Sequence, residues 1–289
     1  MVKSNINSSQ PIFVLGFHRG GTTFVQRLLN CHEKVTIWGE NGGIISDLRV
    51  MSERYAKSPA AKVDVEQYRD FSGLADKFLP WATPFDADQF TSHIASMLES
   101  LYRNPTDLSS FWGFKEIRNG TLEDIDFLCH LFPHCRLIML VRNPKDLLLS
   151  QYFARWGGKH FSGSPEKAVR QIITNYVKSV ESFLEIAQQK PSLAKILRYE
   201  TIQSDTVSHD LFGFLGLPET GISQMLLNEV IRARVGSSFM DTGRLIESNE
   251  NQLICALFDK QIEAVLHDVA SMRALDTIQN WYPTLCRDF

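Results

Sequence analysis

The fold of this chain is decided by residues 16–23, which read GFHRGGTT. Gly16 and Gly21 keep the spacing of the phosphate-binding loop G-x-x-x-x-G-K-[ST], in which the lysine reaches the terminal phosphates and the hydroxyl holds magnesium. Thr23 keeps the hydroxyl, but Thr22 stands in the place of the lysine. The pattern therefore predicts a phosphate-binding loop that handles its ligand without the usual lysine.

The segments on either side of this loop support that interpretation. Residues 11–15 (PIFVL) form a short apolar run typical of a buried parallel strand, and residues 22–30 (TTFVQRLLN) carry apolar side chains at helical spacing. A loop between a strand and a helix presents backbone N–H groups and a helix N-terminus to an anion. A plain tight turn without a ligand is the alternative, and the double threonine in this context disfavours it.

A second strand–helix unit reads RLIMLVRNPKDLLLSQYF and starts with an expected strand at residues 136–141. Asn143 fits a helix N-cap and Pro144 the first helical position, so a helix should begin there. Arg142 then lies at the carboxyl end of a strand, where open α/β sheets bind ligands. Magnesium-dependent NTPases usually carry an aspartate there. An arginine recognises phosphate through its planar fork, and the Ser150 hydroxyl points to the same region.

The remaining pattern predicts an α/β fold with a single parallel sheet flanked by helices. Further strands are expected at 35–38, 110–118 and 194–199, and further helices from 121, at 166–188, at 206–230 and at 251–268. The helix from 121 opens with a capping-box pattern, and the helix at 166–188 has a long apolar stripe.

Composition limits the possible functions. The chain has 289 residues with 44% hydrophobic and 22% charged, as in a soluble globular enzyme. A formal net charge of -3 argues against a nucleic-acid partner. No apolar run approaches the ~20 residues of a membrane helix, and the polar start, MVKSNINSSQ, lacks a secretion signal. We therefore expect a cytoplasmic protein without a membrane partner.

The cysteines predict neither a disulfide framework nor a zinc site. There are five, an odd number, and none forms a C-x-x-C pair. We expect reduced thiols and no bound metal.

The motifs GFHRGGTTF, WGFKEIR, LVRNPKDLLLSQY and LRYET, in that order, resemble the sulfotransferase superfamily that uses 3′-phosphoadenosine 5′-phosphosulfate (PAPS). The resemblance is to bacterial members whose loop reads G-x-x-R-S-G-T-T, and it spans residues 12 to about 201. It implies one domain over residues 1–289 with the P-loop fold of nucleotide kinases, a flexible N-terminus at 1–10, and a largely helical insertion at 40–110 on the acceptor side.

The resemblance also implies donor-binding residues. The loop residues expected at the 5′-phosphosulfate are Arg19, Gly20, Gly21, Thr22, Thr23 and Phe24. Arg142 and Ser150 would hold the 3′-phosphate, and Tyr199 would lie near the adenine. PAPS would be the co-substrate and 3′-phosphoadenosine 5′-phosphate (PAP) the product, with no metal.

This donor explains the missing lysine. A single 5′-phosphate that bears a sulfuryl group has no β,γ-phosphate chain for a lysine and needs no magnesium bridge. Sulfuryl transfer depends mainly on positioning and on stabilising charge at the leaving oxygen, for which we select Arg19 and Lys115. The chain departs from the family at Gly20, usually serine, and at His18, usually proline. The K-T-H histidine of phenol and steroid enzymes is replaced by Ile117.

A general base must accept the proton of the acceptor. His18, Glu40 and Glu116 are candidates because they stand near the donor loop. Glu40 is preferred because it follows the strand at 35–38 and so falls at another carboxyl end facing the same crevice. Its alternative role is structural, as a glutamate that hydrogen-bonds the loop.

The acceptor cleft is expected along residues 40–110 and 152–165. Residues 40–110 hold eleven Asp and Glu against seven Lys and Arg, a balance that disfavours polyanionic acceptors. Aromatic residues interleave with them, namely Tyr68, Phe71, Phe78, Trp81, Phe85 and Phe90. We hypothesise a small neutral or cationic acceptor sulfated on a hydroxyl or on an amine or carbamoyl nitrogen, such as a guanidinium alkaloid toxin of secondary metabolism. Alternatively, the acids are solvated and the aromatics are core.

Two other classes of protein stay open, and a homodimer is possible in each case. An ATP-dependent P-loop kinase is disfavoured by Thr22 and by Arg142 at the strand end. A non-catalytic module that binds PAP or PAPS would keep Arg142 and Ser150 but would not need Lys115.

Overall fold

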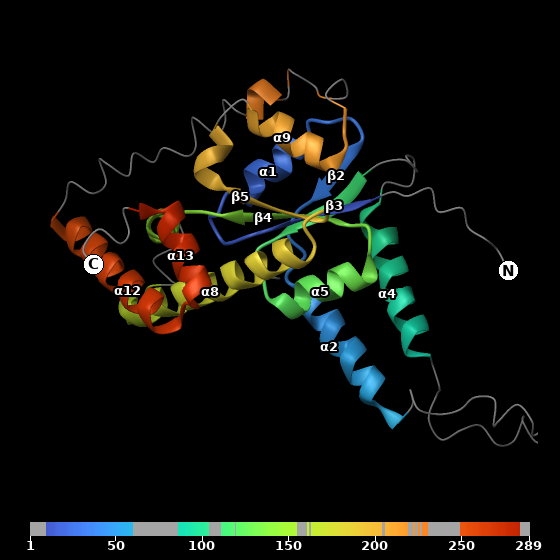
Figure 1. Cartoon of the computed structure of the whole chain (residues 1–289), viewed down its shortest axis with the longest axis horizontal. Coiled ribbons are helices and arrows are strands. Elements are labelled where there is room, and N and C mark those ends of the chain that lie inside the picture. The colour runs from blue at the N-terminus through green and yellow to red at the C-terminus, as the bar shows by residue number, and fades with distance from the viewer. Residues whose placement is uncertain are drawn as a thin grey trace, which may run out of the picture.

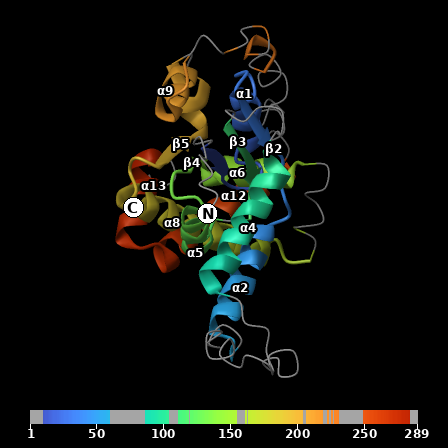
Figure 2. The same ribbon diagram turned by 90° about the vertical axis from the view of Figure 1, so that its right-hand side faces the viewer.

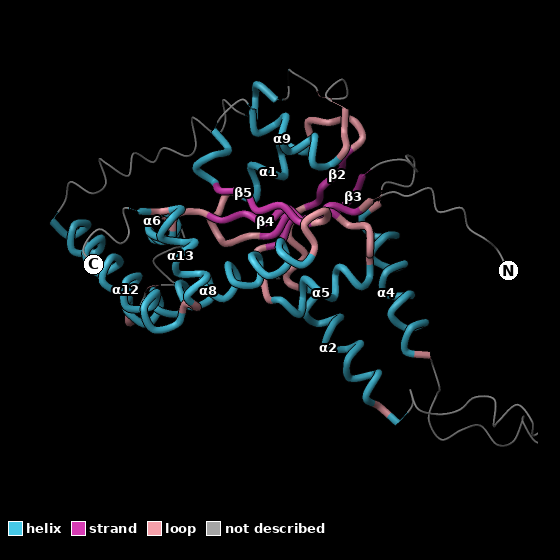
Figure 3. Tube along the Cα trace, in the orientation of Figure 1, coloured by secondary structure: helices cyan, strands magenta, loops and turns pink. Residues whose placement is uncertain are grey.

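The computed structural model describes residues 10–59, 86–103, 111–118, 120–154, 161, 163–203, 206–218, 222, 225, 227–230 and 249–283. Within these ranges the strands form one parallel sheet in the order β2-β3-β1-β4-β5 (Figures 1 and 3). The strands are β1 (Pro11–Leu15), β2 (Val35–Trp38), β3 (Phe111–Glu116), β4 (Arg136–Val141) and β5 (Ala194–Arg198). The predicted α/β class with a single parallel sheet is confirmed.

Helices cover both faces of the sheet. Figures 1 and 2 show α1 (Thr22–Leu29) and α9 (Thr206–Leu215) on one face. The other face carries α2 (Ile44–Lys57), α4 (Ala87–Tyr102), α5 (Leu122–Leu131), α8 (Pro165–Gln189), α12 (Asn249–Val269) and α13 (Met272–Trp281). Helix α6 (Pro144–Tyr152) follows β4 and contacts α8 and α12.

The alternation of side chains along β1 supplies two separate cores. Phe13 and Leu15 are fully buried in the core under α5 and α8, whereas Ile12 and Val14 are fully buried in the core under α1 and α9. Successive strand residues point to opposite faces, so a strand that is covered on both faces is apolar at every position. This explains why PIFVL reads as a continuous apolar run.

The parallel register brings the carboxyl ends of the central strands together. Leu15 of β1 is level with Glu116 of β3 and with Met139 of β4, and the Gly16 N–H donates to the Glu116 carbonyl at 3.2 Å. The loops that follow β1, β2, β3 and β4 therefore meet at one edge of the sheet, where open α/β sheets bind ligands.

The predicted helix starts are confirmed by their caps. The Asn143 side chain accepts from the N–H groups of Lys145 and Asp146, and Pro144 is the first residue of α6. The Thr121 hydroxyl accepts from the Asp124 N–H at the start of α5.

Some predicted boundaries differ from the structure. The helical stretch predicted at 206–230 is interrupted, because α9 ends at Leu215 and Gly216 has a left-handed φ of 68°, which is a common way to end a helix. Residues 225 and 227–230 are helical again. Tyr199 starts a 3-10 helix, η2 (Tyr199–Gln203), and does not end β5.

Parts of other predictions lie outside the described residues. The described parts of the predicted helical insertion at 40–110 contain α2 and α4, while residues 60–85 and 104–110 are outside, as are residues 1–9. Of the interleaved aromatic residues, Phe90 is described, and it stacks on Tyr55 with ring centroids 4.8 Å apart. No helix in the described part of the chain is long and apolar enough to cross a membrane.

Candidate functional site

The loop after β1 has an unusual backbone that shapes the site. Arg19 has a φ of 64°, the one positive value at a described residue other than glycine. The Gly20 N–H donates to the Phe17 carbonyl at 2.8 Å, which closes the turn. A left-handed conformation at a residue with a side chain costs roughly 1–3 kcal/mol and concentrates at functional sites. Here it directs the exposed Arg19 side chain toward α6, where Nε donates to the Ser150 hydroxyl at 3.1 Å.

Two glycines of the loop are required by close packing. A Cβ at residue 20 would lie 2.9 Å from the Phe17 carbonyl oxygen. A serine, which is usual at this position of the related loop, would therefore not fit this backbone without a shift. Gly21 has a φ of 96°, and a Cβ there would lie 2.3 Å from Cδ2 of Tyr199. The Tyr199 ring therefore rests directly on the loop.

Arg142 follows the last residue of β4 and contacts both the loop after β1 and the Tyr199 ring. Its NH1 donates to the Arg19 carbonyl at 2.9 Å, and its guanidinium carbon lies 4.5 Å from the centre of the Tyr199 ring. The Tyr176 hydroxyl donates to the Arg142 carbonyl at 3.0 Å. The Arg142 Nε is buried without a hydrogen-bond partner among the described residues. Buried donors are normally paired, so this unpaired nitrogen fits an anionic ligand such as a phosphate.

These elements enclose a cavity of about 380 Å³, here called the strand-end cavity. It is lined by His18, Arg19, Gly21, Thr22, Thr23, Phe24, Arg27, Glu40, Lys115, Ile117, Arg142, Leu149, Ser150, Phe153, Tyr199 and Val230. Of the predicted site residues, Gly20 and the candidate base Glu116, both buried, are outside this lining, and the others belong to it. The cations Arg19, Arg27, Lys115 and Arg142 outnumber the acid Glu40 in this lining, so the cavity favours an anion.

Sequence reasoning missed Arg27 and the apolar part of this lining. Thr23 and Arg27 are four residues apart on α1 and so share a helix face, a signal that could have identified Arg27. Leu149 and Phe153 show no comparable signal, because apolar residues on α6 are equally consistent with core packing.

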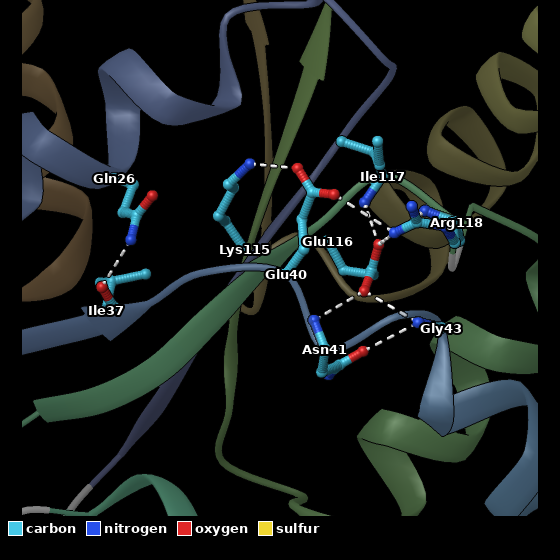
Figure 4. A network of polar contacts seen from close by, with 9 residues as sticks. All are labelled: Gln26, Ile37, Glu40, Asn41, Gly43, Lys115, Glu116, Ile117 and Arg118. Carbon is cyan, nitrogen blue, oxygen red and sulfur yellow. Dashed lines mark hydrogen bonds and ion pairs between the residues drawn. The ribbon is translucent and has the colours of Figure 1, made fainter.

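A network of ions connects the ends of β2 and β3 (Figure 4). The Lys115 ammonium contacts Glu40 Oε1 at 2.5 Å, and Arg118 NH1 contacts Glu40 Oε2 at 3.2 Å. Burial alone would raise the pKa of Glu40, but the hydrogen bonds and charges of Lys115 and Arg118 outweigh it, and the pKa lies below its ordinary value. Glu40 is therefore ionised and paired with cations in this arrangement.

The Glu116 carboxylate has a structural role, because its hydrogen bonds connect two loops. Its side chain is fully buried, and Oε2 accepts from the N–H groups of Asn41 and Gly43, each at 3.0 Å. Oε1 accepts from the N–H groups of Ile117 and Arg118, at 2.8 and 3.2 Å, and from Arg118 NH1 at 3.1 Å. These hydrogen bonds occupy both oxygens of the Glu116 carboxylate, which holds the two loops together (Figure 4). Glu40 and His18 therefore remain as the candidate bases.

A second, larger cavity of about 1040 Å³ lies between α5 and α8 and is here called the α5–α8 cavity. His18 and Ile117 line both cavities. Its other lining residues are Phe17, Arg118, Gly120, Thr121, Leu122, Glu123, Leu147, Gln151, Ile172, Asn175, Tyr176, Lys178, Ser179, Glu181, Ser182 and Glu185. No described residue of 40–110 lines it, so this cavity differs from the cleft expected there.

The α8 wall of this cavity was missed from sequence. Asn175, Ser179 and Ser182 recur at helical spacing beside the apolar stripe of α8. This polar stripe was the available signal, but it is equally typical of a solvated helix face. Among the described residues no cluster of histidine, cysteine, aspartate and glutamate side chains could hold a metal ion.

The family model described as "Sulfotransferase family" matches residues 11–221. The fold is similar to the sulfotransferase domain of the Synechococcus PCC 7002 olefin synthase, with 17% identity, 96% of each chain covered and a TM-score of 0.51. It is also similar to the sulfotransferase domain from the curacin biosynthetic pathway, with 16% identity, 96% of this chain and 98% of that chain covered, and a TM-score of 0.50. Mouse sulfotransferase SULT7A1, crystallised with PAP, shows 11% identity, 95% and 89% coverage, and a TM-score of 0.50. No curated protein matches the sequence.

Proposed function

This chain belongs to the sulfotransferase family, and we propose that it transfers the sulfuryl group of PAPS to a hydroxyl or nitrogen of a small-molecule acceptor. The observation that carries the proposal is the strand-end cavity. Arg142 occupies the place where a magnesium-dependent NTPase carries an acid, and its buried Nε has no partner among the described residues. A cation with an unpaired donor suits the extra 3′-phosphate of this donor.

The donor-binding roles follow from the cavity's lining. We assign the 3′-phosphate to Arg142 and Ser150, and the adenine to the neighbourhood of Tyr199. The 5′-phosphosulfate is assigned to the loop residues Arg19, Gly20, Gly21, Thr22, Thr23 and Phe24. Arg19 contacts Ser150 through Nε and Arg142 through its carbonyl. The residues assigned to the two phosphate groups are thereby in direct contact.

The transfer requires stabilisation of the negative charge that develops on the leaving oxygen. As the acceptor atom bonds to sulfur, the bond between sulfur and the bridging phosphate oxygen breaks, and negative charge develops on that oxygen. Arg19 and Lys115 line the same cavity and are assigned to stabilise this charge, each contributing about 3 kcal/mol. No step of this scheme uses a metal ion.

Glu40 is assigned as the general base that takes the acceptor's proton. It lines the strand-end cavity, and the Lys115 ammonium lies 2.5 Å away. His18 is the second candidate, since it lies in the wall shared by the two cavities. Its carbonyl accepts from Gln151 Nε2 at 2.9 Å, which fixes the backbone at that point.

The acceptor is assigned to the α5–α8 cavity, because this cavity meets the strand-end cavity at His18 and Ile117. Its volume of about 1040 Å³ suits a molecule of drug size. The lining acids are Glu123, Glu181 and Glu185, and the lining cations are Arg118 and Lys178. This balance supports a neutral or cationic acceptor over a polyanion, and a guanidinium alkaloid remains one example of the class.

The direct test is turnover with labelled PAPS and a panel of alcohols, amines and guanidinium compounds, with and without EDTA. We expect label in a small acceptor and equal rates in EDTA. A metal requirement with phosphate transfer from ATP would instead establish the kinase alternative. Binding of PAP without any turnover would establish the non-catalytic module.

Filling the α5–α8 cavity should weaken acceptor binding alone. Ile172 is half-buried on the cavity wall of α8, and Ile172→Trp is expected to raise the KM of the acceptor found in the panel by about tenfold or more. PAP affinity measured by calorimetry should stay unchanged. Lys167→Trp is the control, because Lys167 of α8 is exposed and outside the described lining. An unchanged KM in Ile172→Trp would place the acceptor elsewhere.

A further inference from the structure

Arg118 contacts two carboxylates of very different burial. Its NH1 lies 3.1 Å from Glu116 Oε1 and 3.2 Å from Glu40 Oε2. Glu116 is fully buried and is fixed by backbone N–H groups from both adjoining loops. The side chain of Glu40 keeps 33% of its surface exposed. Arg118 therefore connects a fixed carboxylate to an accessible one (Figure 4).

The two oxygens of Glu40 have different partners. Oε1 accepts from Lys115, which lines the strand-end cavity, and Oε2 accepts from Arg118, which lines the α5–α8 cavity. Lys115 is the residue assigned to the leaving oxygen of the donor. Once its ammonium turns to that charge, Oε1 loses its partner while Oε2 keeps Arg118.

We propose that Arg118 is the positioning residue of Glu40: it holds Oε2 in place so that Oε1 faces the strand-end cavity, which the reacting atom of the acceptor enters to reach sulfur. The inference rests on the proposed function, in which Glu40 is the base. Oε1 takes the proton of the acceptor O–H or N–H, and the electron pair of that bond stays on the acceptor atom that bonds to sulfur. Nucleophilic sites commonly use this arrangement, in which a third group orients the base.

The electrostatic effect of Arg118 gives the proposal a specific signature. The titratable and charged groups around Glu40 are Lys115 and Arg118 in contact, Glu116 on the other side of Arg118, and His18, Arg19, Arg27 and Arg142 in the strand-end cavity. A neighbouring cation favours the ionised carboxylate. Removing Arg118 must therefore raise the pKa of Glu40, and activity should be lost at a higher pH as the solution is acidified.

The experiment is the pH profile of kcat at saturating PAPS for Arg118→Met and Arg118→Lys. For Arg118→Met we expect kcat to fall about 10- to 100-fold, with the acid limb moved to higher pH and PAP affinity within about twofold. Arg118→Lys keeps the charge without the planar fork, so it should restore the acid limb and only part of kcat. Arg170→Met is the control and should change neither, because Arg170 of α8 forms an exposed ion pair with Asp268 of α12.

The outcomes separate this inference from the proposed function. If Glu40→Gln is inactive but Arg118→Met keeps the wild-type acid limb, Glu40 remains the base and the positioning role of Arg118 is wrong. If Glu40→Gln turns over normally, the base assignment itself fails. If both Arg118 variants lose PAP binding or unfold at lower urea concentration than wild type, Arg118 has a structural role and the inference is overturned.

Discussion

Glu40→Gln is expected to lower turnover by about 100-fold or more, because glutamine cannot accept the acceptor's proton. PAP affinity should stay close to that of the wild type, since the assigned phosphate ligands, Arg142 and Ser150, are unchanged. Single-turnover kinetics with labelled PAPS measures the first quantity and calorimetry measures the second. The amide is similar in size to the carboxylate, so the loops held by Glu116 should not be disturbed.

Glu53→Gln is the matched control for this substitution. Glu53 lies on α2, pairs with Arg49 at 2.6 Å and is half exposed, so its replacement should leave turnover unchanged. Normal turnover in Glu40→Gln would exclude it as the base, and His18 would be the next residue to replace. Loss of PAP binding together with activity would instead assign Glu40 to the donor site.

Arg142→Ala is expected to weaken PAP binding by about 100- to 1000-fold, equivalent to roughly 3–4 kcal/mol. The loss arises because the guanidinium makes charge-assisted hydrogen bonds to the 3′-phosphate in this account. Adenosine 5′-phosphate lacks that group, so its affinity should change by less than about threefold. Calorimetric titration of both nucleotides into the variant measures the two effects.

The comparison of nucleotides also separates this effect from damage to the loop. Arg142 NH1 supports the Arg19 carbonyl and its guanidinium covers the Tyr199 ring, so a general collapse of the site would weaken both nucleotides equally. That result would contradict the assignment of Arg142 to the 3′-phosphate. Arg170→Ala, outside the described lining of the cavity, should leave both affinities unchanged.

Much of the fold could be predicted because its signals are local. The apolar run at β1, the cap formed by Asn143 and Pro144, and the glycine spacing of the loop each depend on a few adjacent residues. The end of α9 is not part of the prediction for 206–230, although Gly216 stands one residue beyond it. Glycine after an apolar helical stretch is itself a stop signal.

The candidate site was only partly predictable because its contacts join distant segments. Arg142 and Arg19 are 123 residues apart in sequence, and nothing in either segment predicts their hydrogen bond. The role of Glu116 could have been inferred, since side chains alternate along a strand. Lys115 faces the strand-end cavity, so its neighbour Glu116 must point to the opposite face, away from that cavity.

The central claim is that the strand-end cavity selects a 3′-phosphorylated adenosine nucleotide without a metal ion. Its most direct test is calorimetric titration of the wild-type protein with PAP and with adenosine 5′-phosphate in EDTA. We expect PAP to bind at least about 100-fold more tightly, because Arg142 and Ser150 are assigned to a phosphate that the other nucleotide lacks. Equal affinities for the two nucleotides would contradict it.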